Sequence, residues 1–96
     1  MNATNLNSLS DASLKENLSV IQNPLSLIKN LTGVEFNWSD TKQKSSGLVA
    51  QELEKVIPHL VSTNNGLKSV NYSGLIGYLV ETIKELNTRI EKLERK

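Results

Sequence analysis

The sequence predicts an α+β domain with a small antiparallel sheet, two short helices and a long C-terminal helix. Three observations support this fold class. Residues 34–38 alternate apolar and polar side chains, which is the period of a half-buried strand. Asn65-Gly66 is a strong turn signal within residues 59–72, so that segment is expected to form a hairpin. The C-terminal segment carries apolar residues at the helical coiled-coil spacing.

The chain has 96 residues, enough for one small domain. We expect an upstream linker or arm over residues 1–9, a globular part over residues 10–73 and a coiled-coil helix over residues 74–96. The arm is polar and rich in asparagine, which is typical of a linker. A globular part this small leaves a thin margin of stability, and oligomerisation is a common remedy.

The composition argues against several classes of function. Eleven basic and ten acidic residues give a net charge of +1, so no general attraction to nucleic acid or to an anionic membrane is expected. The chain has no cysteine and a single histidine, His59, so we expect no disulfide and no metal site. No apolar run approaches the roughly 20 residues that span a bilayer. We find no phosphate loop or paired-carboxylate site, so no cofactor is expected and an enzyme acting on a diffusible substrate is disfavoured.

Helix signals divide the globular part. Asn23 is expected to cap a helix that has Pro24 at its first position and Gly33 at its end. Residues 39–46 are predicted to form a polar loop. Residues 47–58 are expected to be a short apolar entry followed by a helix that Pro58 stops.

Five further side chains have expected places. Ser73 is expected to cap the last helix, and Phe36 and Trp38 are expected in the core. Two interpretations stay open for Tyr72 and for Glu52. Tyr72 packs in the core or supports the start of the last helix. Glu52 is a charge on a helix surface or a group that orients Lys15 or the oxyanion site.

The last helix has an apolar seam. Its members are spaced alternately three and four residues apart, with isoleucine at heptad position a and leucine at d: Ile76, Leu79, Ile83, Leu86, Ile90 and Leu93. A chain of this size can hardly cover that stripe itself, so we expect self-association. Isoleucine at a with leucine at d favours a dimer, whereas Arg89 at g and Glu94 at e resemble a trimer-favouring pattern. We expect a homotrimer whose interface includes the seam, Arg89 and Glu94.

Ser10 is followed by Asp11 and, five positions after the serine, by Lys15. One interpretation is a helix cap with a surface lysine, since serine and aspartate are common at helix starts. The other is a serine nucleophile with a lysine base, a recognised variant of the catalytic triad. A lysine must lose its proton to act as a base, and burial between chains favours the neutral amine.

The order of short motifs resembles one known family. Ser10 and Lys15 are followed by NPLSLI, LTGVEFNW, GLVAQELEKVIP with PHLV, KSVNY and a closing LVETIKEL helix, from Ser10 to about Leu93. This resembles the C-terminal intramolecular chaperone domain of phage tail fibres and tailspikes, the endosialidase type, which also occurs in myelin regulatory factor. Because the motifs occur in one order over nearly the whole chain, the resemblance is specific.

The resemblance implies a definite activity. Three copies would associate, bring three upstream fibre domains into register, and then cut themselves off at the Leu9–Ser10 bond. Ser10 would be the nucleophile and Lys15 the base of a single-turnover autoprotease. The domain would work in the host cytoplasm during phage assembly and leave the mature fibre after the cut. Two alternatives stay open: a structural trimerisation module that is never cleaved, and the processing domain of a membrane-bound transcription factor.

Overall fold

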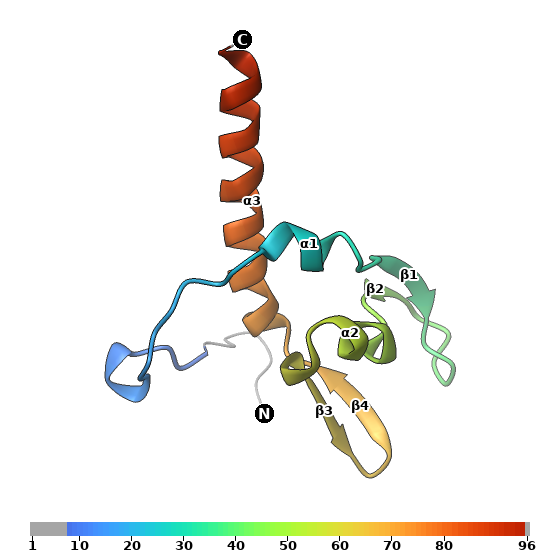
Figure 1. The fold of residues 1–96 in the computed structure, drawn as a ribbon. Helices are drawn as coiled ribbons and strands as arrows, with labels where there is room; N and C mark the ends of the chain where they lie inside the picture. Colours follow the sequence, from blue (N-terminus) through green and yellow to red (C-terminus); the bar gives the residue numbers. More distant parts are fainter. Residues whose placement is uncertain (1–7, 96) are drawn as a thin grey trace.

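The computed structural model describes residues 8–95 and has the α+β architecture that the sequence predicts (Figure 1). Four short helical segments, two hairpins and one long helix make up the described part of the chain. Their bounds, with η for a 3-10 helix, are η1 Ala12–Leu14, α1 Pro24–Ile28, β1 Val34–Asn37, β2 Lys44–Gly47, α2 Ala50–Val56, η2 Pro58–Leu60, β3 Val61–Asn64, β4 Leu67–Val70 and α3 Tyr72–Glu94.

The strands form two separate two-stranded antiparallel sheets. In the second sheet, Val61 pairs with Val70, and the turn residues Asn65 and Gly66 have φ values of 51° and 77°. Positive φ at both turn positions matches the right-handed twist of a hairpin and is the reason for the asparagine–glycine preference. The predicted hairpin is therefore confirmed.

The first sheet corrects a prediction. The polar loop expected over residues 39–46 ends at Gln43, because β2 begins at Lys44 and pairs with β1. Ser45 lies opposite Phe36 and Ser46 opposite Glu35. A strand of lysine, serines and glycine has no apolar alternation, so its pairing with β1 is what makes it a strand.

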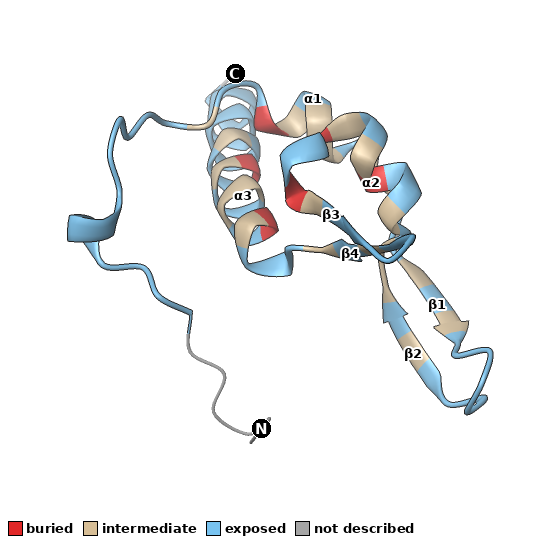
Figure 2. Ribbon diagram, turned by 90° about the horizontal axis from the view of Figure 1, so that it is seen from below, coloured by how far each residue is buried: buried red, intermediate tan, exposed pale blue. Residues whose placement is uncertain are grey.

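The core is small and lies where α2, η2 and the start of α3 meet (Figure 2). Its buried apolar side chains are Leu53, Ile57, Leu60 and Leu75. Phe36 is half-buried, and Trp38 is 52% exposed and packs edge-on against it at 4.9 Å between ring centroids. The expectation that both rings belong to the core was wrong for Trp38, because the β1–β2 hairpin projects away from the core (Figure 2).

Two predicted helix caps also differ. Asn23 adopts a left-handed conformation with φ 52° and makes no side-chain cap, and α1 ends at Ile28 rather than near Gly33. The cap of α3 is Asn71, whose side-chain oxygen accepts a hydrogen bond from the Gly74 amide at 3.0 Å. The helix therefore begins at Tyr72, and Ser73, the predicted cap, lies inside its first turn.

The long helix α3 touches the rest of the domain only along its N-terminal part. Its buried residues are Leu75 and Thr82, and α1 packs beside them. Beyond that contact the helix projects alone to the C-terminal end (Figure 1). The described portion of the chain contains no helix with the length and apolar character needed to cross a membrane.

Candidate functional site

Residues 9–20 form a loop on one side of α3 (Figure 1). At one end of this loop, the Ser8 hydroxyl lies 3.3 Å from the Ser73 hydroxyl at the start of α3. At the other end, Ile21 lies against Gly77, one turn further along α3. The loop therefore leaves α3 and returns to it within about one helical turn.

Asp11 organises the single turn η1 within this loop. Its carboxylate accepts hydrogen bonds from the Ser13 amide at 2.9 Å and the Ser13 hydroxyl at 2.6 Å. These hydrogen bonds, the hydroxyl first and the amide second, lower the pKa of Asp11 below its ordinary value of 3.8. Asp11 therefore caps η1, and Ser10, for which a cap role was considered, does not.

The turn brings Ser10 and Lys15 together. Ser10 lies just before η1 and Lys15 just after it, and the Lys15 Nζ donates a hydrogen bond to the Ser10 Oγ at 2.6 Å. That distance is within the reach required of a nucleophile and its base. Both residues are exposed in the single chain. The five-residue spacing therefore places an amine on the hydroxyl next to the Leu9–Ser10 bond.

Other candidate residues lie elsewhere. Glu52 is exposed on α2 and forms an ion pair with Lys55 at 3.3 Å. This contact agrees with the interpretation of Glu52 as a charge on a helix surface. His59 is exposed, with its ring 6.1 Å from that of Tyr78. Within residues 8–95 there is no group of three histidine or acidic side chains that could hold a metal ion.

The seam of α3 is open to solvent in the single chain. Between 40% and 65% of each of its six side chains is exposed. Arg89 donates a hydrogen bond to Glu85 at 2.8 Å on the same helix, and Leu93 and Glu94 lie in the last turn. Six apolar side chains in one exposed stripe make an unusually large apolar patch for a domain of this size.

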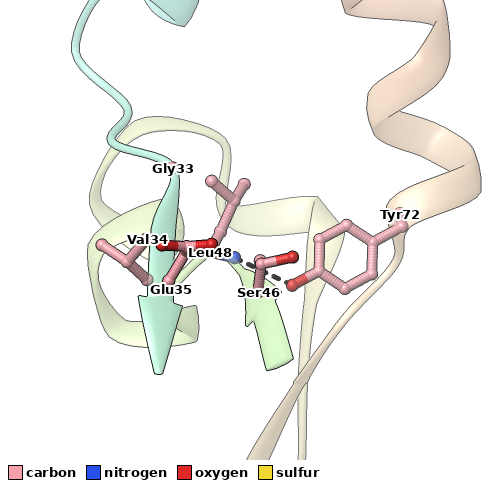
Figure 3. A pocket seen from close by; sticks show the side chains of 7 residues that line it. Gly33, Val34, Glu35, Ser46, Leu48 and Tyr72 are labelled. Atoms are coloured by element: carbon pink, nitrogen blue, oxygen red, sulfur yellow. Dashed lines mark hydrogen bonds between the residues drawn. The ribbon is translucent and has the colours of Figure 1, made fainter. Parts of the chain in front are cut away.

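Tyr72 supports the start of α3, which is the second of the two roles considered for it. Its hydroxyl accepts a hydrogen bond from the Leu48 amide at 3.0 Å, across a shallow pocket lined in part by Gly33, Val34 and Glu35 (Figure 3). Tyr72 is 48% exposed, so it is not a core residue. It connects the end of the β1–β2 hairpin to the first turn of α3.

The fold is a small α+β module whose one long helix carries an apolar seam that is exposed in the single chain. Residues 10–62 match the family described as chaperone of endosialidase. This match covers more than half of the chain and begins at Ser10, and the chain belongs to that family.

Curated relatives are phage fibre proteins. The chain is 34% identical over 106 aligned residues to the long tail fiber protein Gp37 of Enterobacteria phage K3 and, equally, to that of Enterobacteria phage T2. It is 29% identical over 102 aligned residues to Gp37 of Salmonella phage S16. The alignments cover 100%, 100% and 94% of this chain but only 8%, 8% and 14% of the respective fibre proteins. The family expected from the motif order is thereby confirmed.

Proposed function

We propose that this chain is the intramolecular chaperone of a phage tail fibre. It associates as a homotrimer through α3, holds three upstream fibre domains in register while they fold, and then releases itself by cutting Leu9–Ser10. The family match and the fibre relatives support the chaperone role. The observation that carries the cleavage proposal is the 2.6 Å contact between the Lys15 amine and the Ser10 hydroxyl.

The proposed reaction uses only these groups and one water molecule. The neutral Lys15 amine takes the hydroxyl proton as the Ser10 Oγ attacks the carbonyl carbon of Leu9. The C–N bond between Leu9 and Ser10 breaks, the Ser10 nitrogen becomes protonated, and Leu9 is left as an ester on the Ser10 oxygen. Water then hydrolyses the ester, which gives a Leu9 carboxylate and a chain that begins with Ser10.

The proposed step would reverse the hydrogen bond between Lys15 and Ser10. Here the amine donates to the hydroxyl, whereas in the reaction the hydroxyl donates to the amine. The reversal requires a neutral lysine, which burial favours. Because Ser10 and Lys15 are exposed in one copy, the proposal makes cleavage depend on assembly.

Trimerisation rests on the exposed seam. At a spacing of 3.5 residues the six side chains stay on one side of a supercoiled helix, so partner helices would cover all of them. Arg89 at g and Glu94 at e lie beside the seam, where a neighbouring helix can pair with them. Self-association of this kind would act in the host cell during phage assembly.

Cleavage is tested by the intact mass of the chain fused to its natural upstream segment. Splitting before Ser10 is expected in the wild type and in Ser13→Ala, and loss of splitting in Ser10→Ala and Lys15→Ala. Ser13→Ala is the matched control, since it removes a nearby hydroxyl from the same turn. If Ser10→Ala splits as fast as the wild type, Ser10 is not the nucleophile. If no variant splits while the chain is trimeric, the domain is a structural trimerisation module.

Assembly is tested by light scattering on the purified chain. The wild type is expected at three times the chain mass. Ile83→Asp places a carboxylate in the seam of each copy and is expected to shift the protein toward monomer. Thr88→Asp adds the same charge at heptad position f, away from the seam, and is expected to remain trimeric. A wild-type monomer at micromolar concentration contradicts the proposal.

A further inference from the structure

The loop of residues 9–20 exposes apolar side chains that its own chain does not cover. Leu14 is 67% exposed, Leu18 is 78% exposed and Val20 is 65% exposed. The hydrogen bonds of Asp11 and Lys15 stay within the loop. Compact surface loops usually pack their own side chains inside, whereas this loop turns its apolar side chains outward. Such a patch marks a surface of interaction.

The position of the loop on α3 identifies the molecule that covers it. Ile21 and Val20 lie against Gly77, Val80 and Glu81, which occupy heptad positions b, e and f when Ile76 is position a. The loop therefore leaves α3 on the e side of the seam.

The globular part lies on the other side of the seam. It packs against Leu75, Tyr78 and Thr82, which occupy positions g, c and g. The views in Figures 1 and 2 agree, with the loop and the globular part on different sides of α3. The seam runs between these two attachments.

In a parallel coiled coil, position e of one helix faces position g of the next. The e side of each copy carries the loop, and the g side of the adjacent copy carries that copy's globular part. The two therefore meet at each of the three helix interfaces. The exposed loop adjoins the seam, so the copy that covers the seam would also contact the loop, and no other partner is needed.

We infer that in the trimer each loop 9–20 is covered by the globular part of the adjacent copy. Because Ser10 and Lys15 lie in this loop, the neighbour completes the surroundings of the cleavage site. This inference rests on the proposed trimer and adds a specific arrangement to it. The adjacent copy offers exposed apolar side chains for the contact, among them Trp38 and Val49.

Two experiments use the absence of native cysteine. In the first, Leu18→Cys and Leu67→Cys are labelled with a maleimide in the assembled protein. The two leucines are matched in exposure within one chain, at 78% and 77%, but Leu67 lies on the β3–β4 hairpin. Leu18→Cys is expected to react more than about tenfold more slowly, because labelling needs the interface to open. Leu14→Cys is the second loop variant, to be used if Leu18→Cys fails to assemble.

In the second experiment a photoreactive residue replaces Leu18 in trimers mixed from nitrogen-15 and unlabelled chains. The expected cross-link joins the loop of an unlabelled chain to residues 24–71 of a nitrogen-15 chain, or the loop of a nitrogen-15 chain to residues 24–71 of an unlabelled chain. The inference is overturned if Leu18→Cys and Leu67→Cys react with the maleimide at equal rates. It is also overturned if cross-links join only chains of the same isotopic composition. Light scattering separates the cases, because a trimer with a freely reactive loop leaves the proposed function intact, whereas a monomer removes both.

Discussion

The contact between Tyr72 and the β1–β2 hairpin supports a quantitative prediction. A Cβ atom added at Gly47 would lie 2.5 Å from the Tyr72 Oη and 3.5 Å from its Cζ. The first separation is too short for any real contact, whereas the second is ordinary van der Waals contact. Gly47→Ala must therefore push the tyrosine ring away and break its hydrogen bond with the Leu48 amide.

The expected free-energy changes follow from that geometry. Tyr72→Phe removes a neutral hydrogen bond at a half-exposed site, which destabilises by about 0.5–1.5 kcal/mol. Gly47→Ala removes the same bond and adds a backbone term, since φ at Gly47 is 159°. In the phenylalanine background the new methyl group meets no oxygen, so only the backbone term remains. The free energy of unfolding of the double variant should therefore fall by about 1 kcal/mol less than the sum of the two single losses.

The assay is equilibrium urea unfolding of the four proteins, followed by circular dichroism at one fixed chain concentration. The concentration must be constant because assembly shifts apparent stability by mass action. Coupling below about 0.3 kcal/mol, the range of independent sites, would refute the reasoning. It would mean that the ring and the glycine do not share the contact.

Three further predictions concern the core, the α3 cap and the loop. Leu53→Ala is expected to lower the free energy of unfolding by ~2–5 kcal/mol, since Leu53 is 0% exposed, and the exposed Gln51→Ala by far less; similar urea midpoints would contradict the core assignment. Asn71→Ala is expected to lower thermal stability by about 1 kcal/mol through loss of the α3 cap, while Ser73→Ala has little effect; the reverse order would restore Ser73 as the cap. The lowered pKa of Asp11 means that the ionised carboxylate stabilises η1 above pH 3.8 and that this contribution is lost as pH falls through the folded-state pKa. The Ser13 amide resonance in an NMR titration should report this change below pH 3.8, and a change centred above pH 3.8 would contradict it.

The sequence was most informative where one local signal decides the structure. The positive-φ turn at Asn65-Gly66 and the apolar seam of α3 are both set by residue types at fixed spacing, and both were predicted. The contact between Ser10 and Lys15 was also accessible, because the two residues flank a single turn. Their catalytic roles stay predictions.

Other features depend on contacts between distant segments. Strand β2 has no apolar pattern of its own and is defined by its pairing with β1. Asn71 and Ser73 are both good capping residues. The hydrogen bond between Tyr72 and Leu48 ties the first turn of α3 to the residue that follows β2, and the helix begins there, with Asn71 as its cap. Trp38 is half-exposed because its hairpin leaves the core, which strand periodicity alone does not reveal.

The attachment of the loop to α3 at both ends has a thermodynamic consequence. Ser8 and Ile21 hold the two ends of residues 9–20 about one helical turn apart, so the entropy of closing this loop is already lost when the domain folds. A cut between Leu9 and Ser10 would give that entropy back and let the new ends diffuse apart. Rejoining them would require the closure again, so release of the fibre would run in one direction without an external energy source.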